Sequence, residues 1–158
     1  MTAEQSLLKA SLLACTQRIA KLQHSVDKNQ HLFPLTTAVA EALTDAEEES
    51  IDAMILRYSQ CVSMIQDQIF RGVAYLEQED ISDKSNRDKA RLMEKLGAIQ
   101  SADAFGTAAM LRSKFSHHYP DESTARPDRI TLVLAESRLV IVLFQTVTAY
   151  LKRKGLEA

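Results

Sequence analysis

The sequence predicts an all-α protein, a bundle of four or five helices that forms one domain over residues 1–158. Apolar residues recur at steps of three and four along much of the chain, which is the period of one helix face. Only four glycines and three prolines are present, too few for the many tight turns of a β-rich fold. Hydrophobic residues make up 46% and charged residues 25%, an ordinary balance for a globular domain of this length.

The first helix is expected over residues 3–28, followed by a break. A single apolar stripe runs through this segment and contains Leu7, Leu8, Leu12, Cys15, Ile19 and Leu22. Pro34 interrupts the pattern within residues 29–34. A separate turn or two of helix is expected over residues 36–43.

The longest helix is predicted over residues 45–77. Thr44 and Glu47 have the spacing of a capping box, and acidic side chains follow in the first turn, where the helix dipole favours them. A sustained apolar stripe then contains Ile51, Ile55, Tyr58, Val62, Ile65, Ile69, Val73 and Leu76. We therefore expect Tyr58 and Tyr75 to lie on a helix that is mostly packed.

Two shorter helices are expected after a polar loop over residues 79–86. The first spans residues 86–99, with Gly97 near its end. Ser101 is placed to cap the second. This helix is expected to end near residues 117–119, because Pro120 disfavours a helical conformation in the residue before it.

The last helix is predicted over residues 129–154, after a polar loop at 121–128. The run 139–144 is rich in β-branched residues and locally fits a strand. However, no glycine or proline occurs between Asp128 and Lys154, and a strand of that length would be abnormal. A helix that is apolar nearly all round is buried on several sides. It is therefore expected at the centre of the bundle or in a dimer interface.

Charge and composition limit the classes of function. The net charge of −2 and a pI near 6.1 argue against a protein that coats nucleic acid generally, so RNA binding would require a local basic cluster. Two candidates exist, at residues 112–114 and 152–154, and the second is better explained as cations at a helix end. The chain starts without a signal peptide and has no uninterrupted stretch of about 18 apolar residues. We expect a cytoplasmic protein without a membrane span.

No metal or cofactor is expected. The sequence has no glycine-rich phosphate loop, no clustered Cys/His spacing and no nucleophile elbow. His24 and His31 have no nearby acidic or sulfur partners in the sequence, which predicts surface histidines. Cys15 and Cys61 lie among helix-periodic apolar residues, which predicts buried free thiols.

Residues 111–121 concentrate cations and proton-transfer groups at the predicted end of the penultimate helix. Arg112 can bind a phosphate bidentately, and His117 can act as an acid or base near neutral pH. Their spacing of five residues corresponds to about 140° around an ideal helix. They would converge only if the helix ends or loosens near Ser116, or if two copies meet across a two-fold axis and share one cleft.

The pattern Arg-x-x-x-x-His-x-Tyr followed by proline, on the penultimate helix of a small bundle, resembles the HEPN family. It is most similar to the short HEPN proteins paired with a minimal nucleotidyltransferase in toxin–antitoxin modules, including those described as nucleotidyltransferase substrate-binding subunits. The segment 55–58 is similar to part of the family's second helix. The resemblance implies a symmetric homodimer and a metal-independent endoribonuclease whose active cleft lies at the dimer interface.

The resemblance also implies roles for individual residues. Arg112 and His117 would be catalytic, and Tyr119 would lie at the rim as a target of adenylylation by the partner nucleotidyltransferase. Ser113, Lys114 and His118 are candidate RNA contacts, although Ser113 stands where the family commonly has an amide. Two alternatives remain: a non-catalytic nucleotide- or partner-binding subunit of a minimal nucleotidyltransferase, and a helical dimerisation module without a ligand.

Overall fold

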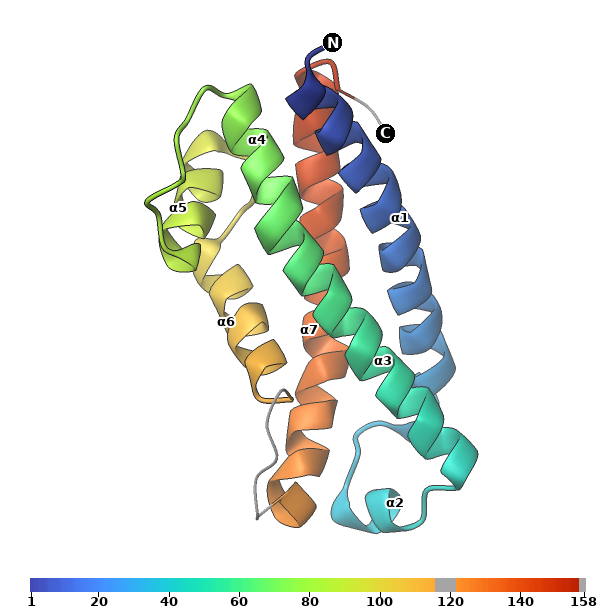
Figure 1. Cartoon of the computed structure of the whole chain (residues 1–158). Helices are drawn as coiled ribbons and strands as arrows, with labels where there is room; N and C mark the ends of the chain where they lie inside the picture. Colours follow the sequence, from blue (N-terminus) through green and yellow to red (C-terminus); the bar gives the residue numbers. More distant parts are fainter. Residues whose placement is uncertain (116–121, 157–158) are drawn as a thin grey trace.

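The structure is a computed structural model that describes residues 1–115 and 122–156, and the side chains of 122–124 are not considered. Within these ranges the chain forms helices and no strand, so the all-α prediction is confirmed. The helical elements are α1 (Ala3–Asn29), η1 (Gln30–Leu32), α2 (Thr37–Glu41), α3 (Asp45–Met64), η2 (Ile65–Ile69), α4 (Phe70–Leu76), α5 (Asn86–Leu96), α6 (Ala102–Ser113) and α7 (Glu122–Arg153). Figure 1 shows α1, the α3–α4 segment and α7 running along the length of the bundle.

The helix α1 has the predicted bounds and packs most extensively against α3. Its start is fixed by a capping box between Thr2 and Gln5. Cys15 and Cys61 are both buried and free, as predicted. Burial, and to a smaller extent the neighbouring thiol of Cys61, raises the pKa of Cys15 to about 12. The thiols therefore act as small apolar core groups.

The predicted long helix is present and runs without a break through α3, η2 and α4. Its capping box is confirmed: the Glu47 amide donates to Thr44 Oγ1 at 3.2 Å, and the Thr44 amide donates to Glu47 Oε1 at 2.9 Å. The sequence does not indicate that η2 is a π-helical turn. This wide turn buries Gln66 together with its apolar neighbours Ile65 and Ile69.

Tyr75 differs from the prediction. It lies on α4 but is 46% exposed, because it faces away from the core that Val73 and Ala74 help to form. Tyr58, in contrast, is completely buried. One tyrosine of this long helix is therefore a core residue and the other lies on the surface.

The end of α6 also differs from the prediction. Ser101 caps the helix as expected, accepting a hydrogen bond from the Ala104 amide. The helix ends at Ser113, however, and not near residues 117–119. The Ser113 hydroxyl donates to the Met110 carbonyl at 2.7 Å, and the following backbone amides bond three residues back, which closes the last turn.

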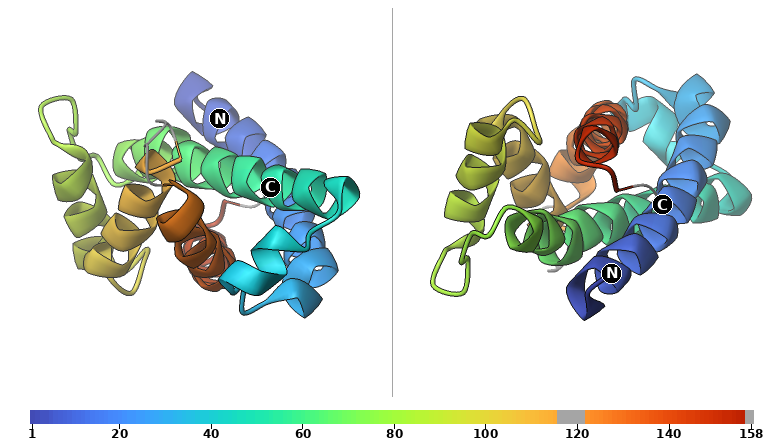
Figure 2. Two further views of the ribbon diagram at one scale, coloured as in Figure 1. Left: turned by 90° about the horizontal axis from the view of Figure 1, so that it is seen from below. Right: turned by 90° about the horizontal axis from the view of Figure 1, so that it is seen from above.

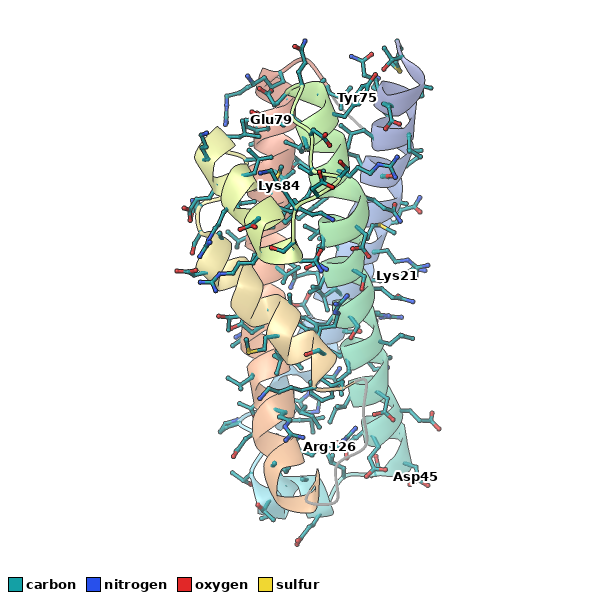
Figure 3. All side chains as sticks on the ribbon, turned by 60° about the vertical axis from the view of Figure 1, so that its left-hand side comes forward. Lys21, Asp45, Tyr75, Glu79, Lys84 and Arg126 are labelled. Atoms are coloured by element: carbon teal, nitrogen blue, oxygen red, sulfur yellow. The ribbon has the colours of Figure 1, made fainter. Side chains whose placement is uncertain are left out.

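The helix α7 begins at Glu122, seven residues before the predicted start at Arg129. The expected loop over 121–128 was inferred from its polarity and from Pro127, but proline fixes φ near −65°, which a helix accepts. Pro127 lies in the second turn, where it costs one backbone hydrogen bond. Arg126 ties this start to α3 through an exposed 3.3 Å ion pair with Asp52; Figure 3 shows Arg126 at that end of the bundle.

Of the two positions expected for α7, the structure shows the one at the centre of the bundle. This helix contacts α1, α2, α3 and α6, and the end views in Figure 2 show it between α1 on one side and the α5–α6 pair on the other. By length and composition alone, α7 could cross a membrane over Ala125–Arg153. Half of the apolar 18-residue window within this range is buried inside the bundle, which favours a core helix over a membrane span.

Candidate functional site

Arg112 occupies the last turn of α6 and is half-buried. Its Nη1 donates a 2.5 Å hydrogen bond to the hydroxyl of Ser63, near the end of α3. Within the described residues the guanidinium makes no other hydrogen bond. One side of it is therefore anchored, and its other donors can bind a planar or tetrahedral anion such as phosphate.

Tyr58 lies beneath Arg112 in the interface between α3 and α6. Its hydroxyl donates a hydrogen bond to the carbonyl of Ala108, one turn before Arg112. Burial raises the pKa of Tyr58 well above 10, the carboxylate of Glu136 raises it further, and the positive charge of Arg112 partly opposes both. The phenol is therefore a neutral hydrogen-bond donor that joins the two helices.

Glu136 brings a carboxylate from α7 toward the same interface. Its Oε2 is buried and has no hydrogen-bond partner among the described residues, and the same is true of the neighbouring Ser137 hydroxyl. Burial raises the pKa of Glu136 above its ordinary value. A carboxyl group in this state exchanges protons closer to neutral pH than an exposed one, which suits acid–base chemistry.

Three helices thus bring Arg112, Tyr58 and Glu136 into one polar region within an apolar bundle. Arg112 and Glu136 each act electrostatically on the Tyr58 phenol, which places each of them near Tyr58. The region combines an anchored cation with a carboxyl group whose pKa is raised by burial. Such a combination can hold a phosphate and move a proton beside it.

Only part of the predicted site lies in the described residues. Arg112, Ser113 and Lys114 are described, whereas His117, His118 and Tyr119 lie outside the described residues. Ser113 and Lys114 are both exposed. The Ser113 hydroxyl is directed to its own helix, at the Met110 carbonyl, and does not contact Arg112.

A groove opens beside Arg112, between α5 and α6. Its volume is about 610 Å³, and its lining includes the arginines Arg87 and Arg91 of α5 and the buried amide of Gln66 from the π-turn. Turns of this kind occur frequently at functional sites. The anchored arginine therefore lies at the edge of a cavity large enough for a small ligand.

The second basic cluster, residues 152–154, has local partners. Lys154 pairs with Glu77 at 3.3 Å, and Arg153 and Lys154 lie 5.9 and 5.6 Å from the centre of the Tyr150 ring. Burial raises the pKa of Tyr150 to about 12. These contacts support the interpretation of this cluster as cations at a helix end.

Neither Tyr58 nor Glu136 is recognisable as a site residue in the sequence. Tyr58 fits the apolar stripe of its helix, as a core residue would. Glu136 carries a usable signal, since it is the only acidic residue between positions 129 and 153. A carboxylate on a helix that is otherwise nearly apolar is costly to bury, so its presence indicates a binding partner or a functional role.

Within the described ranges, no group of three or more His, Cys, Asp or Glu residues is placed to hold a metal ion. Comparison of the chain with models of protein families, with characterised proteins and with solved structures gives no match.

Proposed function

We propose that the protein is an HEPN-type endoribonuclease that acts without a metal ion, and that it is the toxin of a toxin–antitoxin module in the cytoplasm. The observation that carries the proposal is Arg112, which is half-buried, anchored by the Ser63 hydroxyl and five residues before His117 in the sequence. Arginine binds phosphate bidentately, and histidine transfers protons near neutral pH.

In the proposed reaction the RNA 2′-oxygen attacks the adjacent phosphorus, and the bond from phosphorus to the 5′-oxygen breaks. In each of the two equivalent sites of the shared cleft, one His117 accepts the 2′ proton, and the leaving 5′-oxygen takes up a proton from water. Arg112 stabilises the added negative charge of the phosphorane-like transition state. The nucleophile belongs to the RNA itself, so the chemistry proceeds without a metal-bound hydroxide.

A symmetric homodimer with a shared cleft forms part of this proposal. The face of α7 that points away from the bundle supports it, because Leu132 and Val142 are each more than half exposed. No charged residue occurs on α7 between Arg138 and Lys152, although this stretch is partly exposed. An exposed and uncharged helix face of this kind fits an interface between two copies.

The second candidate function is a non-catalytic subunit that binds a nucleotide or a minimal nucleotidyltransferase. One observation favours it. Ser113 replaces the amide that commonly follows the arginine in the family, and its hydroxyl bonds to the Met110 carbonyl and not to Arg112 or the groove. The site would then hold phosphate but lack the amide that commonly follows the arginine in the family.

Labelled single-stranded RNA incubated with the purified protein separates the two functions. The ribonuclease proposal predicts fragments that end in a 2′,3′-cyclic phosphate, formed equally well with and without EDTA. Fragments that disappear with EDTA would contradict a metal-independent reaction. Retention of intact RNA, with measurable binding, would favour the non-catalytic subunit.

A further inference from the structure

The groove between α5 and α6 has the features of a binding site beyond the Arg112 centre. It is lined by three arginines, Arg87, Arg91 and Arg112, and by one carboxylate, Asp103. The protein as a whole carries a net charge of −2, so this excess of positive charge is local. The charge of the groove therefore favours an anionic ligand.

Gln66 gives the groove a second, independent feature. Its side chain is 5% exposed, contributes to the groove lining and makes no hydrogen bond to any described residue. Its donor and acceptor remain available for a ligand that offers a matching acceptor and donor, as the edges of nucleobases do.

The wall that α6 contributes includes three small residues among larger ones. Ala102, Gly106 and Ala109 follow one another at steps of four and three, and all three line the groove. A Cβ atom placed on Gly106 would meet no atom within 4 Å. The groove is therefore open at Gly106, which leaves room there for part of a ligand.

We propose that this groove binds one nucleotide unit, with its phosphate on the arginines and its base edge on the Gln66 amide. The inference rests on the proposed function for its substrate, because Arg112 is common to both sites. It adds a subsite for the nucleotide next to the one that is cleaved. The same chemistry would accept a nucleotide within RNA or a free mononucleotide.

Direct binding tests this subsite without cleavage. The probe is a fluorescently labelled, fully 2′-O-methylated oligoribonucleotide, which lacks the nucleophile and stays intact, and AMP serves as a second probe. Gly106→Leu fills the groove from an open position, and Gly106→Ala is its matched control. Arg91→Ala removes a lining charge, and Lys95→Ala removes an exposed charge from the same helix outside the groove.

Gly106→Leu and Arg91→Ala should each weaken binding of the oligonucleotide by about tenfold or more, whereas both controls should bind like the wild type. Gln66→Met should also weaken binding while leaving thermal stability unchanged or higher, because it replaces an unpartnered buried amide with an apolar group of similar size. This pairing of lost binding with retained stability excludes simple unfolding.

The two sources give different results with AMP. A subsite for free mononucleotide requires that AMP binds to the wild type and that Gly106→Leu abolishes this binding. A subsite within RNA requires that only oligonucleotide binding depends on Gly106. Wild-type affinity of Gly106→Leu and Gln66→Met for both probes would overturn the inference. Cleavage of unmodified RNA is measured separately, so loss of the ribonuclease proposal would not be mistaken for loss of the subsite.

Discussion

Arg112 reaches Ser63 across the interface between α6 and α3, and this contact determines how its removal should behave. Arg112→Ala leaves Ser63 half-exposed and able to bond to water, so the fold should persist. Loss of the charge at the transition state should lower RNA cleavage about 100- to 1000-fold.

His117→Ala should lower RNA cleavage to a similar extent, because it removes the group proposed to transfer the proton. Initial cleavage rates test both variants, with Lys95→Ala as an exposed control; near wild-type rates for both would exclude them as catalysts.

Glu136 predicts a pH dependence of stability. Burial raises its pKa above the ordinary value of 4.5, so the folded protein holds this proton more tightly than the unfolded chain. Stability is therefore fully present below about pH 4.5 and falls as the pH rises through the folded-state pKa. Glu136→Gln removes this loss and should be at least as stable as the wild type near neutral pH, with no advantage in acid.

Urea unfolding of the wild type and Glu136→Gln over this pH range provides the measurement. Asp128→Asn, at an exposed acidic position on the same helix, is the control for loss of one negative charge. A variant that is less stable than the wild type at neutral pH would show that the Glu136 carboxylate has a favourable partner in solution.

The position of Tyr119 in the sequence leads to a prediction about inhibition of the proposed activity by adenylylation. Tyr119 lies two residues after His117 in the sequence, so an AMP group attached there would bring phosphate to the proposed catalytic groups and compete with RNA. Co-expression with a cognate minimal nucleotidyltransferase should add one or more AMP units and lower activity without lowering thermal stability. Intact mass spectrometry measures the modification.

The structure sharpens the control for this experiment. Tyr75 is exposed, contrary to the prediction from the sequence, and is the alternative acceptor to exclude. The added mass should vanish in Tyr119→Phe and persist in Tyr75→Phe. The reverse pattern would identify Tyr75 as the acceptor, and inhibition would then have to arise away from the cleft.

At the scale of elements, two helical glycines should respond in opposite directions to the same substitution. A Cβ on Gly72 of α4 would overlap the side chain of Leu8 on α1, so Gly72→Ala should destabilise the protein by about 1–3 kcal/mol. Gly106 of α6 has open space, so Gly106→Ala should stabilise it by about 0.5–1 kcal/mol through helix propensity. Thermal unfolding should show a lower Tm for the first and a higher one for the second. Equal shifts would show that the approach of α4 to α1 is not close.

Helix starts governed by local chemistry could be predicted from the sequence. The Thr44–Glu47 capping box and the Ser101 cap depend on residues within one turn, and both are confirmed. The π-turn at η2 and the early start of α7 could not be predicted in this way. An extra residue in one turn leaves the apolar pattern almost unchanged, and the polarity of residues 122–128 reflects an exposed helix start as readily as a loop.

At the scale of the molecule, the candidate functional site shows most clearly what could not be predicted from the sequence. Arg112 stands out in the sequence because of its spacing from His117. Its neighbours Tyr58 and Glu136 come from other helices, and their proximity depends on how α3, α6 and α7 pack. The groove beside α5 likewise requires the inward position of Gln66, which follows from the π-turn. Local patterns identify single groups, whereas packing determines which groups meet.

The proposed dimer provides the last prediction. In a shared cleft, Arg112 of one copy acts with His117 of the other. A mixture of the inactive variants Arg112→Ala and His117→Ala then forms mixed dimers in which one site has both native residues and the other has neither. If half of the dimers are mixed, about a quarter of the wild-type activity should return. Unfolding and refolding the two variants together ensures exchange of subunits.

The alternative geometry gives a different result. If Arg112 and His117 of the same chain formed each site, every site in the mixture would lack one residue and no activity would return. Light scattering gives the oligomeric state in parallel, and Val142→Glu provides the control. It adds a charge to an exposed position one turn after Arg138, at the start of the uncharged stretch of α7, where it should leave the helix intact but make the protein monomeric and inactive. A dimeric, active Val142→Glu variant would exclude this face as the interface, while recovery of activity in the mixture would still establish that the cleft is shared.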